Sequence, residues 1–413
     1  TGSVLWHPDP GVATLCWTWF CGPFSPLRMI GLALAAVSLA IWIYLVFARG
    51  GFWLGRERDD AAIVPPANPP RVTVVVPARN EADNIAQSVT SLLAQDYPAL
   101  ALVLVDDDSD DGTADVARRA AAALGKEDSL TVINSGALPP RWTGKLWAVK
   151  QGIAAAEEKF APKYLMLTDA DIVHAPDTAR WLVAHAEANS LVLTSLTARW
   201  RCENLPERVH IPAFIYYFEM LYPFAWVNRP DHPMAGAAGG CMLVRTDALR
   251  AAGGIDIIRD ALIDDCALAG AMKKQGPIWL GLTDRVISIR PYTSWGDIRR
   301  MVARSAYAQL NYSPLALIGT VAGLFLTYLV PPFMALFASG WAQIFGVAAW
   351  ALMAISFQPI LRFYRLSPLW GIALPAITFL FMLYTLDSAY QYAAGKGGIW
   401  KGRVQAKAHD HGG

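Results

Sequence analysis

Four long apolar runs without a charged residue constrain this chain more than any other feature. A helix needs about 20 such residues to cross the hydrocarbon core of a bilayer, and each run has roughly that length. The chain as a whole is 54% hydrophobic and only 17% charged, which is too apolar for an ordinary soluble enzyme of 413 residues. We therefore expect membrane helices within residues 30–48, 315–338, 341–361 and 369–386.

The segment between the first two runs has an ordinary density of charge, which is typical of a domain in water. We expect this domain at residues 71–290, after a Pro-rich linker at 50–70. The net charge of +1 and the lack of a basic stripe give no reason to expect a nucleic-acid partner. An upstream extension or expression remnant is expected at 1–28 and a membrane helix at 29–49. An interfacial segment is expected at 291–314, about three further membrane helices at 315–390 and a basic tail at 391–413.

Basic residues next to the apolar runs predict the orientation of the chain. Arg49, Arg56 and Arg58 follow the first run, which places its end and the following domain in the cytoplasm. The basic tail favours the same side, whereas a fourth full crossing would put it outside. A re-entrant or interfacial last segment, broken at Pro375, would resolve this conflict.

Within residues 71–290, short apolar runs alternate with helical patterns. This alternation predicts an α/β domain with a mainly parallel sheet, in which ligands bind at the carboxyl ends of the strands. The expected strands lie at 72–76, 100–105 and 130–134, and the expected helices at 83–94 and 114–124.

Two of the apolar runs end in clusters of carboxylates. One reads VLVDDDSDDGT at residues 103–113, and the other reads YLMLTDAD at residues 164–171. Either cluster alone could be a solvated turn that caps the next helix. Two such ends side by side would repel each other unless a cation sat between them, which indicates a metal-assisted site for a phosphorylated ligand.

The order of the motifs resembles glycosyltransferase family 2, whose catalytic domain has the GT-A fold. The shared motifs are VVVPARNE at 74–81, DDDSDDGT at 106–113, DAD at 169–171 and the acid pair at 264–265. Longer stretches are similar to the hopene-associated glycosyltransferases called HpnB, and the resemblance runs from Met29 to the end. These stretches are IWIYLVFARGGFW, ALPPRWTGKLWAVKQG, IPAFIYYFEMLYPFAWVN, AAGGCMLV, ALIDDCALA and MVARSAYAQLNYS.

The resemblance implies a Rossmann-like GT-A domain joined to transmembrane helices. It also implies a multi-pass protein of the bacterial inner (cell) membrane with its catalytic domain in the cytoplasm. Such an enzyme transfers a sugar from a nucleotide diphosphate sugar, with a UDP-sugar favoured, to the hydroxyl of a lipid. The family name alone suggests a hopanoid as that acceptor.

Asp169 and Asp171 are the predicted metal ligands. Their carboxylates, one residue apart at a strand end, can hold one Mg²⁺ or Mn²⁺, which bridges to the diphosphate. The alternative is that they cap the turn before Pro176.

The resemblance also implies a set of residues that bind the nucleotide sugar. Asp106 and Asp107 match acids that contact the base and ribose, and Glu81 can reach the same groups. Lys145 is similar to a lysine aimed at the diphosphate, although a solvated surface lysine has the same sequence signal. The full predicted set is Pro77, Arg79, Glu81, Asp106, Asp107, Lys145 and Asp169, whereas Asp110 and Asp111 are expected to cap a helix.

Asp265 is the predicted catalytic base, because inverting relatives use one carboxylate to take the proton from the acceptor hydroxyl. Asp264 stands where relatives carry Glu and is expected to support it. The structural alternative is a pair of acids that complements the dipole of a helix N-terminus.

Two other functions remain open at this point. A processive polysaccharide synthase is disfavoured, because residues 299–309 lack the tryptophan of the Gln/Arg-x-x-Arg-Trp element found in many such relatives. A catalytically idle transport or scaffold protein would be expected to lack one of the acids. The aromatic segment 211–227 is either core or a helix lying at the membrane interface.

Overall fold

The structure, a computed structural model, describes residues 26–395, 397–400 and 403–406. The chain divides into two compact units. One holds the residues up to 51 together with 315–382, and the other holds 52–314 together with the residues from 383 onward. Most of the predicted N-terminal extension lies outside the described residues, as do parts of the predicted basic tail.

Three described helical stretches are long and apolar enough to cross a membrane: Pro26–Phe47, Pro314–Phe337 and Trp341–Phe363. The first is helix α2, and the second comprises α12 (Pro314–Leu324), a π-helical turn η5 (Phe325–Leu329) and α13 (Val330–Phe337). The third comprises α14 (Trp341–Ser356) and α15 (Gln358–Phe363). Many of their large apolar side chains are exposed, among them Phe47, Leu315, Phe337 and Trp341. This exposure suits helices that are surrounded by lipid.

The fourth apolar run is not among these candidate spans. Its residues form a short 3₁₀ turn, η6 (Pro368–Gly371), and the start of α16 (Leu374–Ala393). The run is interrupted at residues 372–373, close to the expected break at Pro375. This proline lies in the first turn of α16, where its missing N–H costs no helical hydrogen bond.

Within the first unit, α2 packs against α13, α14 and the π-helical turn. The Trp42 indole is fully buried and donates to the backbone oxygen of Thr327 at 2.7 Å. A π-turn disturbs the regular helical ladder, so this indole satisfies a carbonyl there. The Trp42 ring also meets Tyr328 edge to face, with 5.3 Å between the ring centroids.

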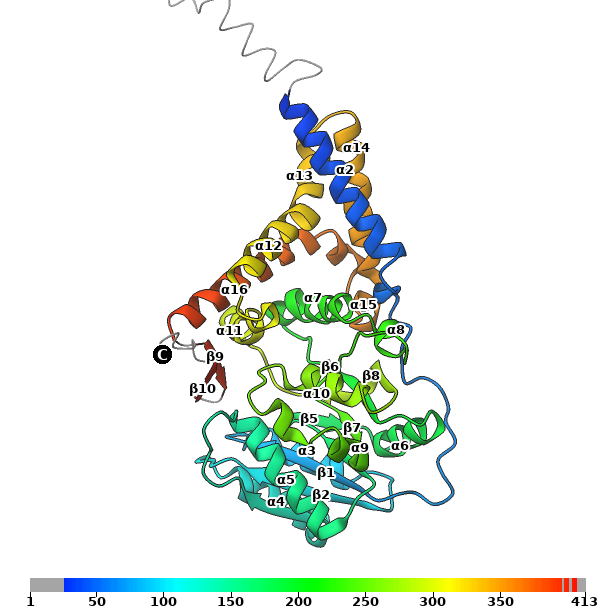
Figure 1. The fold of residues 1–413 in the computed structure, drawn as a ribbon, viewed down its shortest axis with the longest axis vertical. Helices are drawn as coiled ribbons and strands as arrows, with labels where there is room; N and C mark the ends of the chain where they lie inside the picture. The colour runs from blue at the N-terminus through cyan, green and yellow to red at the C-terminus, as the bar shows by residue number, and fades with distance from the viewer. Residues whose placement is uncertain (1–25, 396, 401–402, 407–413) are drawn as a thin grey trace, which may run out of the picture. The chain divides into compact units, whose positions relative to one another are not determined.

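The second unit contains an eight-stranded mixed sheet with the strand order β3-β2-β1-β4-β7-β6-β8-β5. Figure 1 labels β1, β2, β5, β6, β7 and β8 of this sheet. Strands β1 to β4 run parallel, whereas β7 is antiparallel to both β4 and β6, and β5 is antiparallel to β8. The strands are β1 (Val72–Ala78), β2 (Leu100–Asp106), β3 (Leu130–Asn134), β4 (Tyr164–Leu167), β5 (Ile172–His174), β6 (Leu193–Trp200), β7 (Met242–Arg245) and β8 (Ile278–Ser288).

The predicted strands and helices of the first half are confirmed to within one or two residues. Helices α3 (Ile85–Leu93) and α4 (Thr113–Ala123) lie where the sequence predicts them. The register aligns Ala78 of β1 with Asp106 of β2, and Val75 of β1 with Leu167 of β4. The two acidic strand ends therefore meet at one edge of the sheet, on either side of the end of β1.

Helix α5 (Gly144–Phe160) lies directly on β1 and β2, and one glycine sets how closely it approaches. A Cβ on Gly152 would lie 2.4 Å from Cγ1 of Val75 and 2.8 Å from Cγ2 of Val105. No larger residue fits there without moving the helix. The close approach brings the first turn of α5, with Lys145, to the acidic edge.

The remaining helices of this unit are α6 (Thr178–Ala188), α7 (Leu205–Leu221), α8 (Phe224–Val227), α9 (Thr246–Ala251), α10 (Asp264–Lys273) and α11 (Trp295–Ser305). Tyr216, Phe224 and Ile215 are buried, so core packing holds for much of the aromatic segment 211–227. Helix α11 lies in the predicted interfacial segment and buries Ile298, Val302 and Ala303. Strands β9 (Gly397–Trp400) and β10 (Arg403–Ala406) form an antiparallel pair.

Candidate active site

The first group of predicted residues surrounds the ends of β1 and β2. Arg79 donates to the backbone oxygens of Asp107 and Asp108, which fixes the acidic turn to the end of β1. Asp107 is 1% exposed and accepts from the Ser135 hydroxyl at 2.8 Å. Its burial favours an ordering role in the turn and leaves Asp106 as the more accessible of the two predicted nucleotide-binding acids.

Asp111 accepts a hydrogen bond from the first residue of helix α4, whereas the N-cap itself is Gly112 and makes no side-chain cap hydrogen bond. Its carboxylate accepts from the backbone N–H of Thr113 at 3.0 Å and of Ala82 at 2.9 Å. These hydrogen bonds hold the pKa of Asp111 below its usual value, although burial acts in the opposite direction as the largest single effect. One acid of the cluster is thus used for folding.

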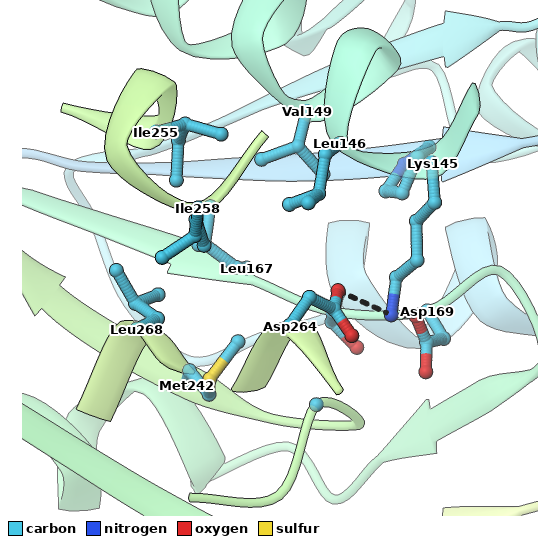
Figure 2. Close-up of a pocket in the computed structure, with 13 residues that line it drawn as sticks. Lys145, Leu146, Val149, Leu167, Asp169, Met242, Ile255, Ile258, Asp264 and Leu268 are labelled. Carbon is cyan, nitrogen blue, oxygen red and sulfur yellow. Dashed lines mark ion pairs between the residues drawn. The ribbon is translucent and has the colours of Figure 1, made fainter. Parts of the chain in front are cut away.

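Lys145 connects the second acidic strand end with Asp264, the neighbour of the predicted catalytic base. Its Nζ lies 3.0 Å from Oδ1 of Asp169 and 3.1 Å from Oδ2 of Asp264 (Figure 2). A lysine at the first turn of a helix opposes the helix dipole, and burial also disfavours its charge. The carboxylates of Asp169, Asp264 and Asp265 outweigh the burial and raise the pKa of Lys145 above its usual value. Lys145 is therefore a fixed cation and not a solvated surface side chain.

A small cavity of about 20 Å³ lies beneath this ion-pair cluster. Pro77 and apolar side chains such as Leu146, Met242 and Leu268 line it, and Lys145 and the two acids lie at its polar end (Figure 2). Ligand sites usually have volumes of about 300–1,000 Å³. The cavity is thus a small gap in the apolar packing beside the site, and a sugar nucleotide would have to occupy another volume.

Asp265 is held by two backbone amides. The N–H of Gly239 donates to its Oδ2 at 3.0 Å, and the N–H of Cys266 donates to its Oδ1 at 2.7 Å. Burial and the neighbouring charge of Asp264 raise the pKa of Asp265 to about 6, against the opposing effect of Lys145. A carboxylate with a pKa near neutrality is suited to accepting a proton.

The loop at residues 236–240 lies against this carboxylate. A Cβ on Gly239 would lie 3.5 Å from both Oδ2 of Asp265 and Nζ of Lys145. The Gly239 amide is thus used by Asp265. Asp264 and Asp265 are also the first two residues of helix α10. Their charges therefore complement the helix dipole, as the structural alternative predicts.

Arg290 is the residue of this edge that sequence reasoning missed. Its guanidinium pairs with Glu81 and with Asp171, which lie beyond the ends of β1 and β4. These carboxylates raise the pKa of Arg290, whereas burial, the largest single effect, opposes them. Burial also raises the pKa of Asp171. The only sequence signal was an arginine followed by proline just after β8.

The residues present fit a divalent cation. Asp169 uses Oδ1 for Lys145, and Asp171 uses Oδ2 for Arg290, so each carboxylate keeps a second oxygen for a hard metal ion. Among the described residues no three His, Cys, Asp or Glu side chains are grouped as a ready metal site. Any remaining ligands would have to come from the bound donor or from water.

Residues 73–253 match the family model described as glycosyl transferase family 2. The chain is similar to a mannosyltransferase from Pyrobaculum calidifontis solved with GDP-Man and Mn²⁺, at 23% identity and a TM-score of 0.53, over 88% of this chain and 98% of that one. It is also similar to glucosyl-3-phosphoglycerate synthase from Mycobacterium tuberculosis solved with Mn²⁺, UDP-Glc and glycerol 3-phosphate, at 17% identity and a TM-score of 0.38, over 59% and 79%. No curated protein matches the chain.

The likeness to the mannosyltransferase shows the fold. The second unit contains a GT-A-like mixed sheet, and residues 73–253 within it match the family 2 model. The expected fold class is therefore confirmed. The particular resemblance to the hopene-associated enzymes receives no support from these matches.

Proposed function

We propose that this protein is a membrane-bound inverting glycosyltransferase that transfers one sugar from a nucleotide diphosphate sugar to a lipid hydroxyl. The single observation that carries the proposal is the position of Lys145 between Asp169 and Asp264. This lysine brings the predicted metal motif and the acid pair Asp264 and Asp265 into one cluster. A purely structural sheet edge would have no need to gather four partly buried charged groups together.

Asp265 takes the proton of the acceptor hydroxyl in this proposal. As that oxygen attacks the anomeric carbon, the bond from the sugar to the diphosphate breaks on the opposite face, and the nucleotide leaves. The Gly239 and Cys266 amides hold the Asp265 carboxylate in place while leaving it lone pairs for the proton. Lys145 is proposed to contact the diphosphate oxygens.

Asp169 and Asp171 are proposed to hold Mg²⁺ or Mn²⁺. Such an ion, when bound, neutralises the charge that develops on the leaving diphosphate. Arg79, Glu81 and Asp106 are proposed to bind the nucleotide, with a UDP-sugar favoured. Because the similar mannosyltransferase was solved with GDP-Man, GDP-sugars are tested beside UDP-sugars.

A lipid acceptor is supported by the three helices that are long and apolar enough to cross a membrane. The arginines after the first helix favour a cytoplasmic catalytic domain and a multi-pass protein of the inner membrane. The lack of the tryptophan near residue 304 favours single transfer over processive synthesis. A hopanoid as acceptor rests on the resemblance to the hopene-associated family alone.

A panel of donors tests the proposal directly. The full chain in detergent micelles is incubated with UDP-, GDP- and dTDP-sugars in Mn²⁺, and release of the nucleoside diphosphate is measured with and without bacterial lipid extract. We expect release from one donor class, stimulated by lipid, and loss of release in Asp265→Asn. Asp260→Asn, an exposed acid outside the cluster, is the matched control. Absence of release with every donor would reject the proposal.

A further inference from the structure

A buried chain of hydrogen bonds runs beneath the candidate site. Thr168 directly precedes Asp169 and is 2% exposed, and its hydroxyl lies 2.7 Å from the backbone oxygen of Gly240. The same hydroxyl lies 3.0 Å from Nε2 of His174, which is 3% exposed. Three segments of the fold therefore meet at one side chain: the end of β4, strand β5 and the loop before β7.

The directions of these hydrogen bonds follow from the groups involved. A carbonyl oxygen can only accept, so Thr168 must donate its single hydroxyl proton to Gly240. Nε2 of His174 must then carry a proton and donate it to the Thr168 oxygen. Burial lowers the pKa of His174 to about 3, which keeps the ring neutral, and the hydrogen bond to Thr168 selects the tautomer with a proton on Nε2.

The other ring nitrogen of His174 supports a specific role for the residue. Nδ1 is buried and has no hydrogen-bond partner within the described part of the chain. An unpaired buried polar atom costs free energy, and an apolar residue of similar size would avoid that cost. The cost is consistent with a histidine retained for its Nε2 donor.

The chain of contacts continues from Gly240 to the predicted base. Gly239, the preceding residue, donates its N–H to Asp265 at 3.0 Å. The same loop is held from β6, because Ser195 accepts from the N–H of Ala238 at 2.9 Å. Thr168 thus ties the strand that carries Asp169 to the loop that orients Asp265.

We propose that Thr168 and His174 are positioning residues for the transfer reaction. They fix the loop at 236–240 relative to the end of β4, and through that loop they set the distance between the Asp265 carboxylate and the donor site at Asp169. This inference rests on the proposed function. A displacement of about 1 Å in a reacting group can cost about 100-fold in rate, so a loosened loop should damage the chemical step.

Substitutions at Thr168 test the role of its hydroxyl. Thr168→Val keeps the shape and removes the hydrogen bonds, so we expect kcat to fall about 10- to 100-fold, while the KM for the donor stays within about twofold because the substitution removes no proposed donor contact. Thr168→Ser keeps the hydroxyl and should restore most of kcat. Thr73→Val is the matched control, because Thr73 is fully buried in the neighbouring β1 and its hydroxyl has no partner among the described residues.

His174 offers an independent pair of variants should Thr168→Val fail to fold. The side-chain amide of His174→Gln can still donate to Thr168, whereas His174→Leu cannot. We expect kcat to fall in His174→Leu and to recover in His174→Gln. Equal loss in both variants would overturn the positioning role.

Hydrogen exchange measures the loop without any need for turnover. In the full chain in detergent micelles, the backbone amides of Gly239 and Cys241 should exchange faster in Thr168→Val than in the wild type or in Thr73→Val. Unchanged exchange would overturn the inference even if the enzyme is active, and so would an unchanged kcat. A wild type that uses no donor but shows the expected exchange would reject the proposed function and leave the hydrogen-bonded link intact.

Discussion

Replacing Asp265 by Asn should slow sugar transfer strongly and change how the stability of the protein depends on pH. Burial, with a contribution from Asp264, raises the pKa of Asp265 from 3.8 to about 6. A carboxyl whose pKa is higher in the folded than in the unfolded state favours folding while it is protonated, and this advantage is lost as the pH rises from about 4 to about 6. The difference between the two pKa values corresponds to about 3 kcal/mol.

Asparagine removes this pH-dependent effect at the expense of a hydrogen bond. Its amide group can accept through only one atom, so either the Gly239 or the Cys266 N–H loses its acceptor, which costs about 1–3 kcal/mol. At pH 7 the two effects nearly cancel, and the variant should be about as stable as the wild type. At pH 4 only the lost hydrogen bond remains, and the variant should be less stable.

Thermal unfolding at pH 4, 5.5 and 7 in one detergent measures this change, and transfer kinetics measure the catalytic effect. We expect kcat to fall about 10² to 10⁴-fold while the affinity for the nucleotide sugar in Mn²⁺ stays near normal. The wild-type kcat/KM should fall below pH 6. A stability difference that does not change with pH, a lost donor affinity with intact single-turnover chemistry, or greater damage from Asp264→Asn would refute the reasoning.

Three further predictions concern the metal, the orientation and Arg290. Asp169→Asn and Asp171→Asn should each abolish turnover and weaken metal-dependent nucleotide binding, and full activity in excess EDTA would contradict the metal site. In sealed inside-out vesicles, protease should cleave near the exposed residues Gly125, Lys126 and Glu127, whereas cleavage from the periplasmic side alone would reverse the proposed orientation. Arg290→Met should lower the unfolding temperature, at a cost of up to about 3 kcal/mol, because it leaves the buried carboxylates of Glu81 and Asp171 without their cation. Mn²⁺ should then stabilise this variant more than the wild type, and equal stabilisation would argue against a shared site.

The sequence alone determined the parts of the fold that depend on local patterns. Alternating apolar and helical periods fixed the strands and helices from residue 72 to 134, because side-chain burial on a parallel strand or one helix face repeats within a few residues. Long uncharged runs predicted the apolar helices, because run length and the lack of charge are also read within one segment. The acidic ends of β2 and β4 could be placed at one edge, since parallel strands that are joined by helices align their carboxyl ends.

Only the tertiary structure decided which charged groups face one another. Arg290 lies 209 residues from Glu81 and 119 from Asp171 along the chain, and no local period links such positions. The antiparallel insertion of β7 between β4 and β6 brings the 236–240 loop beneath Asp265 and beside Thr168. Strand order is set by the packing of the whole sheet, so the partners of Lys145, Arg290 and Thr168 follow from the assembled fold and not from any segment of it.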